Sequence, residues 1–150
     1  MSRIAVLLLF AGCGPAAPVS DAEALLGEWA VVDFHAPGGA EDRSQFRNRA
    51  RVSAETWSQQ FNEGLYEDFE YTIDPTRAPK HLDLTYTDPR GKRLTVRAIY
   101  EIAGDELRVC MGSPPVVVSP AGTARYAESR RPSAFEAKDG ALMVFHRAKK

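Results

Sequence analysis

The sequence predicts an all-β protein, an antiparallel barrel of eight strands, with a β-sandwich as the alternative. Short runs of alternating apolar and polar residues recur along the chain between turn signals, whereas helical periodicity is almost absent. The 150 residues, 44% hydrophobic and 26% charged, suit one globular domain with its own core. Closure into a barrel would also remove the exposed edges that an open sheet leaves.

Alternation marks the individual strands most clearly in the middle of the chain. Leu82 and Leu84 fall on one face of such a run, and Asp83 falls on the other. A short helical turn is expected over residues 21–26, and a short edge strand over residues 116–118 in a long proline-containing loop. Strands are predicted over residues 28–34, 49–57, 66–73, 81–87, 94–102, 106–111, 133–137 and 141–147.

The first thirteen residues have the layout of an export signal. Arg3 precedes an apolar run over residues 4–11, which is too short to span a membrane, and Cys13 follows directly after Gly12. This run resembles the processing box of bacterial lipoproteins, which implies a lipid on Cys13 and an exported, membrane-anchored protein, periplasmic or at the cell surface. The alternative is an ordinary secretory signal that ends near a cysteine. The expected organisation is a signal peptide over residues 1–12, a tether over 13–24 and a single β-barrel domain over 25–150.

Composition and motifs argue against several functional classes. A net charge of -1 argues against nucleic acid as a partner. The three histidines lack metal-ligand spacing, so we expect neither a metal nor another cofactor. No nucleophile motif is present, and Asp74 and Asp105 adjoin proline or glycine, where turns explain them. Cys110, the second of two cysteines, is expected to be a small buried hydrophobic residue.

Several runs along the chain resemble a family of short secreted domains that is abundant in Planctomycetes. The matching runs occur in the family's order over most of residues 25–147. The family has no established activity, so the resemblance implies a fold and an exported location but no reaction. The runs that carry it are residues 26–32, 71–75, 79–84, 99–110 and 131–135.

The run Gly27-Glu28-Trp29 is similar to the Gly-x-Trp opening of lipocalins. In that fold the tryptophan closes one end of an eight-stranded barrel, and an arginine of the last strand packs over it. The resemblance therefore implies that Gly27, Trp29 and Arg147 form a structural barrel end, with a cation–π contact between guanidinium and indole.

Two groups of residues are candidates for binding. The aromatic residues Phe69, Tyr71, Tyr86, Tyr100 and Phe135 are candidates for lining a cavity for a small apolar ligand, although such residues also fill small barrels. The basic residues Arg125, Arg130 and Arg131 are candidates for binding an anion at the barrel mouth. The alternative is that these arginines pair with acidic residues and fix the loop.

These observations favour a non-catalytic envelope module that binds a small apolar ligand or an envelope protein. This hypothesis rests on analogy between folds. One alternative is a structural or interaction lipoprotein whose barrel is filled by its own side chains, and a hydrolase without a recognisable motif is the third. An open apolar cavity would favour the first, and an exposed apolar patch over a filled interior would favour the second.

Overall fold

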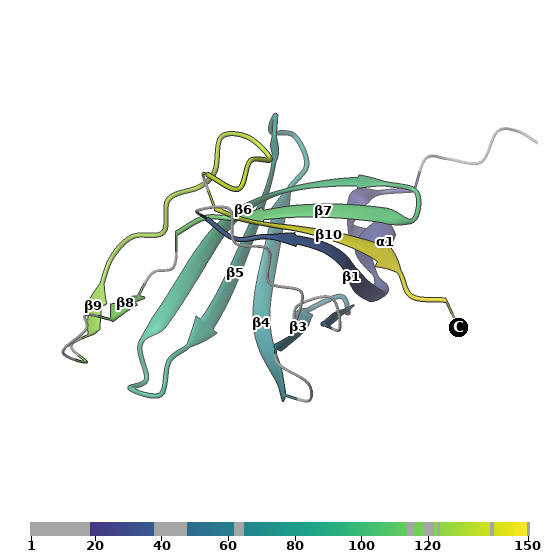
Figure 1. The fold of residues 1–150 in the computed structure, drawn as a ribbon. Coiled ribbons are helices and arrows are strands. Elements are labelled where there is room, and N and C mark those ends of the chain that lie inside the picture. The colour runs from purple at the N-terminus through teal and green to yellow at the C-terminus, as the bar shows by residue number, and fades with distance from the viewer. Residues whose placement is uncertain are drawn as a thin grey trace, which may run out of the picture.

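Antiparallel strands curl into a closed barrel, in the order β1-β10-β7-β6-β5-β4-β3-β2 (Figure 1). The computed structural model describes residues 19–37, 48–61, 65–113, 116–118, 122, 124–138 and 140–149. The barrel strands are β1 (Gly27–His35), β2 (Arg49–Val52), β3 (Thr56–Phe61), β4 (Leu65–Asp74), β5 (Lys80–Thr87), β6 (Arg93–Ala103), β7 (Glu106–Met111) and β10 (Ala141–Arg147). The predicted all-β, eight-stranded, lipocalin-like barrel is confirmed.

Two of the predicted strands are wrong. Residues 49–57 form parts of two strands, because the Ser53 hydroxyl accepts hydrogen bonds from the N–H groups of Glu55 (3.4 Å) and Thr56 (3.0 Å) and closes a turn. Residues 133–137 form bends and a turn instead of a strand. The eighth barrel strand is therefore β3, and residues 133–137 stay outside the barrel ladder.

A separate two-stranded sheet lies beside the barrel. Residues 116–118 form the predicted short strand, β8 (Val116–Val118), but it pairs with β9 (Ala124–Tyr126) and not with the barrel. The Tyr126 hydroxyl donates to the Asp88 carboxylate at 2.6 Å, and Lys92 Nζ lies 3.7 Å from the centre of the Tyr126 ring. These contacts hold β9 against the turn between β5 and β6, far from α1 (Figure 1).

The two ends of the barrel differ. The helix α1 (Asp21–Leu25) covers one end, which we call the closed end; the other end, where β1 finishes and β10 begins, is the mouth (Figure 1). Residues 21–24, expected from the sequence to be part of a tether over 13–24, belong to this helix. The expected signal peptide over residues 1–12, the expected lipidation site Cys13 and residues 14–18 lie outside the described residues. Within the described part of the chain, no helix is long and apolar enough to cross a membrane.

Apolar side chains from all eight barrel strands form the core inside the barrel. Trp29, Trp57, Tyr100 and Phe145 are its largest members, and each is at most 1% exposed. Trp57 contacts Tyr71 and Phe145 edge to face, with ring centroids 6.4 and 6.2 Å away. The alternation of apolar residues in the sequence therefore predicts the inward faces of the strands correctly.

A second buried layer lies on the outer face of the barrel wall. Ile99 and Cys110 are opposite each other in the ladder between β6 and β7 and point outward, yet both are fully buried. They are covered by the chain over residues 127–138, which we call the return segment; its Pro132 is buried, and the Cys110 thiol lies 3.7 Å from the carbonyl oxygen of Glu136. Cys110 is thus the small buried residue that the sequence indicated.

Candidate functional site

The closed end is built around the short helix α1. Ser20 caps it in a capping box with Glu23, so that backbone N–H groups at its start are satisfied. Asp21 then accepts hydrogen bonds at 2.7 Å from both Lys80 Nζ and the Tyr100 hydroxyl. These two contacts attach the helix to β5 and β6.

The titration of Asp21 follows from these contacts. Burial acts to raise the pKa of Asp21, but the hydrogen bonds from Lys80 and Tyr100 and the charge of Lys80 outweigh burial and lower it. Burial, together with the hydrogen bond to Asp21, raises the pKa of Tyr100 strongly. Tyr100 is therefore a neutral donor and Asp21 an ionised acceptor near neutral pH.

We expect the closed end to lose stability in acid through Asp21. A carboxyl whose pKa is lowered in the folded state stabilises fully above its ordinary value of 3.8, and this contribution disappears as the pH falls through the lower, folded value. Denaturant unfolding from about pH 5 to about pH 2 should therefore show a larger loss of unfolding free energy in the wild type than in Asp21→Asn. Equal losses in both proteins would contradict this assignment.

The three residues of the expected barrel end meet below the helix. The indole Nε1–H of Trp29 donates to the Leu25 carbonyl at 2.8 Å, and the Arg147 guanidinium lies 4.2 Å from the ring centre of Trp29. Arg147 also donates to the carbonyl oxygens of Ala24 (2.7 Å) and Leu26 (2.9 Å). Gly27 has φ = +123°, and a Cβ there would lie 3.1 Å from Arg147 Nη1, so both backbone and space favour glycine. This end of the barrel is sealed by structural contacts.

Arg147→Ala is expected to lower the free energy of unfolding by about 2 kcal/mol, because it removes a cation–π contact and two charge-assisted hydrogen bonds. Arg147→Lys should recover only part, since an ammonium keeps the charge but does not reproduce the planar fork of donors. Thermal unfolding measures both. An unchanged melting temperature in Arg147→Ala would show that the guanidinium does not hold this end together.

The predicted ligand-lining aromatic residues do not form one set. Tyr71 and Tyr100 belong to the closed half of the barrel: the Tyr71 hydroxyl donates to the Ser53 carbonyl at 2.8 Å, and Tyr100 reaches Asp21. Phe135 lies outside the barrel, in the return segment, with the outward-facing Arg108 guanidinium 4.8 Å from its ring centre. Phe135 is thus not on a barrel strand, because residues 133–137 form bends and a turn.

Phe69 and Tyr86 remain as an aromatic pair inside the barrel. Their rings meet edge to face with centroids 5.7 Å apart; Phe69 is buried, whereas Tyr86, next to the last residue of β5, is half-buried. Beside Tyr86, between the ends of β4 and β5, lies an open depression of about 410 Å³ that Glu67 and Asp88 also line. Burial first, and then these two carboxylates, raise the pKa of Tyr86, so its hydroxyl is a neutral donor.

Inward-facing apolar side chains stay partly exposed toward the mouth. They come from the mouth-proximal parts of β1, β5, β6 and β7 and pack against the buried core. Deeper in the barrel, by contrast, the largest side chains are inaccessible to solvent. We call this group the mouth patch; its members are Phe34, Tyr86, Val96 and Met111.

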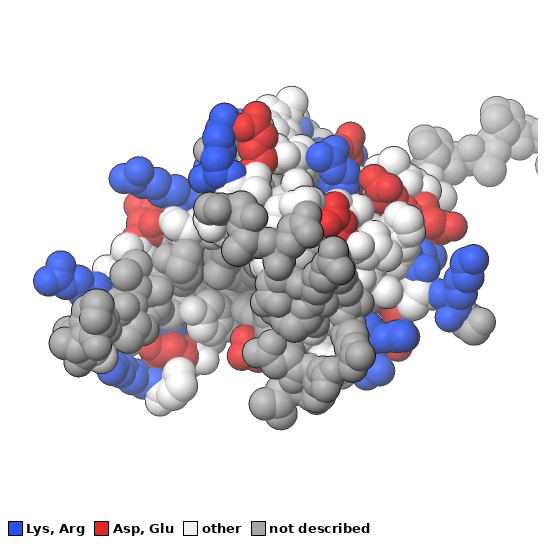
Figure 2. Space-filling model, in the orientation of Figure 1, with Lys and Arg blue, Asp and Glu red and all other residues white. Residues whose placement is uncertain are grey.

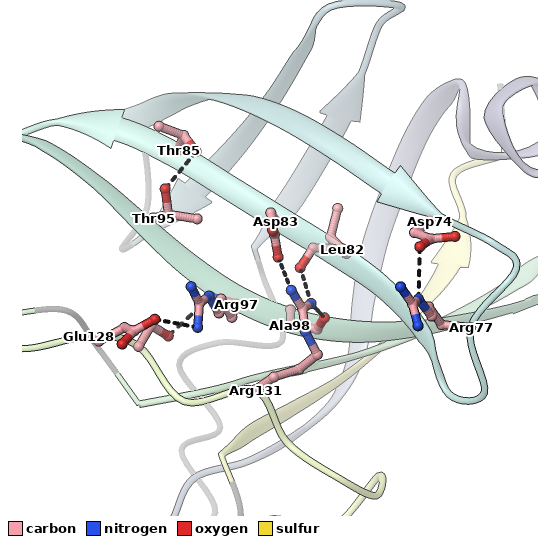
Figure 3. A network of polar contacts seen from close by, with 11 residues as sticks. Asp74, Arg77, Leu82, Asp83, Thr85, Thr95, Arg97, Ala98, Glu128 and Arg131 are labelled. Atoms are coloured by element: carbon pink, nitrogen blue, oxygen red, sulfur yellow. Dashed lines mark hydrogen bonds and ion pairs between the residues drawn. The ribbon is translucent and has the colours of Figure 1, made fainter.

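The three predicted anion-binding arginines have different surroundings. Arg131 is occupied: its guanidinium donates to the carbonyl oxygens of Leu82 and Ala98 and to the Asp83 carboxylate (Figure 3). This arginine pins the return segment onto β5 and β6, which is the alternative that the sequence left open. Arg125, on β9, and Arg130 are exposed.

Arg130 and Arg131 also line an open depression of about 870 Å³ on the outer face of the barrel. Its other walls are Arg97 of β6, Ser113 after β7 and residues 127–129. Sequence reasoning missed Arg97, although it lies opposite Asp83 in the ladder and on the same outward face, because this site joins three segments that are distant along the chain. The register of β5 and β6 could have identified Arg97, because it places this residue opposite Asp83.

The described residues show no group of three or more His, Cys, Asp or Glu side chains that could hold a metal ion. Figure 2 shows Lys and Arg interspersed with Asp and Glu over the visible face. Searches against protein-family models, curated proteins and solved structures find no match to this chain.

Proposed function

We propose that this protein is a non-catalytic binding module of the bacterial envelope that holds a small apolar ligand at the mouth of its barrel. The mouth patch carries the proposal: apolar side chains from four strands face inward and remain partly exposed there, beside the buried core of the barrel. Binding sites for small molecules are concave, apolar and edged by a few polar groups. The Tyr86 hydroxyl and the neighbouring carboxylates supply such groups.

The proposed location agrees with this role. A lipid on Cys13 would attach the protein to a membrane, as the processing-box resemblance implies, and would leave the barrel in the surrounding compartment. Residues 14–18, rich in alanine and proline, then form the tether.

An uncharged fluorescent probe, N-phenyl-1-naphthylamine, tests the proposal, and 1-dodecanol serves as its competitor. The wild type should bind the probe and release it to dodecanol. Val96→Glu places a carboxylate in the mouth patch and should weaken binding at least about tenfold, since an ion loses hydration in an apolar site. Val32→Glu is the matched control, because Val32 is 43% exposed and lies outside the buried core, and this variant should bind like the wild type.

Circular dichroism verifies that both variants are folded. A wild type that binds neither probe nor dodecanol would exclude a ligand site at the mouth and would favour a filled barrel that acts through its surface. Equal weakening by Val32→Glu and Val96→Glu would place probe binding elsewhere.

A further inference from the structure

The depression on the outer face carries more positive than negative charge. Arg97, Arg130 and Arg131 line it. Asp83 neutralises Arg131, and the Glu128 carboxylate pairs with Arg97 at 2.6 Å (Figure 3). Among the described residues, the guanidinium of Arg130 has no acidic partner, so three cations face two carboxylates.

Two serine hydroxyls add neutral donors to the same place. Ser129 Oγ accepts the backbone N–H of Arg97 at 3.0 Å, and Ser113 Oγ accepts that of Arg130 at 3.1 Å. A hydroxyl that accepts a hydrogen bond still has its own O–H to donate. Guanidinium and hydroxyl donors without a matching acceptor are the groups that bind an oxyanion.

Glu128 shows which oxyanion fits this site. Its side chain is 75% exposed, and its only ion pair in the described structure is the one with Arg97. An exposed ion pair contributes little to stability, so displacing this carboxylate costs the fold little. The Glu128 carboxylate thus lies where the carboxylate of a ligand could pair with the Arg97 guanidinium.

We propose that this depression is a second binding site, for a small carboxylate-bearing ligand, and that Glu128 occupies the ligand's place until it is displaced. Arg97 and Arg130 bind the carboxylate, and Ser113 donates a further hydrogen bond. The site lies on the outer face of the wall, so it is independent of the apolar ligand at the mouth.

Glutarate, titrated into the full-length protein labelled with nitrogen-15, tests the proposal. We expect saturable shifts of the Arg97 and Arg130 side-chain Nε–H signals in the wild type. Arg130→Ala should weaken binding about tenfold or more, because it removes a charge-assisted contact and leaves the fold intact. Arg125→Ala removes the same charge from an exposed position on β9 and should leave the affinity unchanged.

Glu128→Gln gives the expectation that distinguishes this site from a generally basic surface. Removing Glu128 as a competitor raises the apparent affinity by the inverse of the fraction of time that the site is free of it. Because an exposed ion pair is weak, glutarate should bind about two- to fivefold more tightly. Glu70→Gln, which neutralises a carboxylate paired with Arg93, controls for the change in net charge and should not tighten binding.

The proposal is overturned if glutarate gives no saturable shift in either the wild type or Glu128→Gln. It is also overturned if Arg125→Ala weakens binding as much as Arg130→Ala, or if Glu70→Gln tightens it as much as Glu128→Gln. The probe at the mouth is uncharged, so the two sites succeed or fail separately.

Discussion

Trp57→Ala is expected to lower the free energy of unfolding by about 4 kcal/mol, the largest loss that we predict for a single side chain in this barrel. Trp57 is fully buried, and its ring contacts Tyr71 and Phe145 edge to face. Alanine would leave a cavity that three strands cannot close without moving. Denaturant unfolding measures this loss directly.

The Trp57 side chain also donates a hydrogen bond to a buried amide. Its packing and its hydrogen bond can therefore be tested separately. Its Nε1–H donates to Gln59 Oε1 at 3.2 Å, and Gln59 is itself fully buried. Trp57→Phe keeps most of the packing but leaves the amide oxygen without this donor, and we expect a loss of about 2 kcal/mol. Adding Gln59→Leu should recover part of that loss, because the buried polar group is then gone. No recovery would show that packing alone accounts for the effect of Trp57→Phe.

Gly112→Ala is the second large effect, about 3 kcal/mol of lost unfolding free energy. A Cβ at Gly112 would lie 1.8 Å from the carbonyl oxygen of Arg130 and 2.7 Å from that of Arg97. Both contacts are with backbone, so no side chain can rotate away. Because Gly112 also donates its N–H to the Arg97 carbonyl at 2.9 Å, the return segment must lift away from the sheet.

Gly104→Ala is the control for Gly112→Ala. Gly104 has φ = +60°, which is strained for alanine, but a Cβ there meets nothing within 4 Å. Its replacement should cost about 1 kcal/mol, from the backbone alone. Equal costs at the two positions would show that the close approach of the return segment does not limit stability.

The positions that sequence reasoning predicts correctly are those where one face of a strand is buried. Leu82 and Leu84 are buried and Asp83 is not. Side chains alternate between the two faces of a strand, and only one face of β5 borders the core at these positions. The turn at Ser53 escaped prediction because it contains neither glycine nor proline; a serine hydroxyl closes it instead. Residues 133–137 do not form the predicted strand because they have no free edge with which to pair, since β7 already pairs with β6 and β10.

The candidate sites could be predicted only where residues close in sequence act together or where a resemblance links distant ones. The Gly-x-Trp resemblance related Trp29 to Arg147, which lie together at the closed end. No such pattern relates Arg97 to Ser113 and Arg130, because the return segment meets β6 through the tertiary fold alone. Phe135 shows the converse, since an aromatic residue near a predicted strand does not face the barrel interior.

The buried layer formed by Ile99 and Cys110 on the outer face of the barrel affects local unfolding of the strands that carry it. In β6, Ala98 and Tyr100 are buried inside while Ile99 is buried outside, and Val109 and Cys110 repeat this arrangement in β7. Strands that are covered on both faces have their backbone hydrogen bonds shielded from solvent on both sides, and such segments exchange their amide hydrogens only through the largest openings. We therefore expect hydrogen exchange to be slowest in the pair β6–β7.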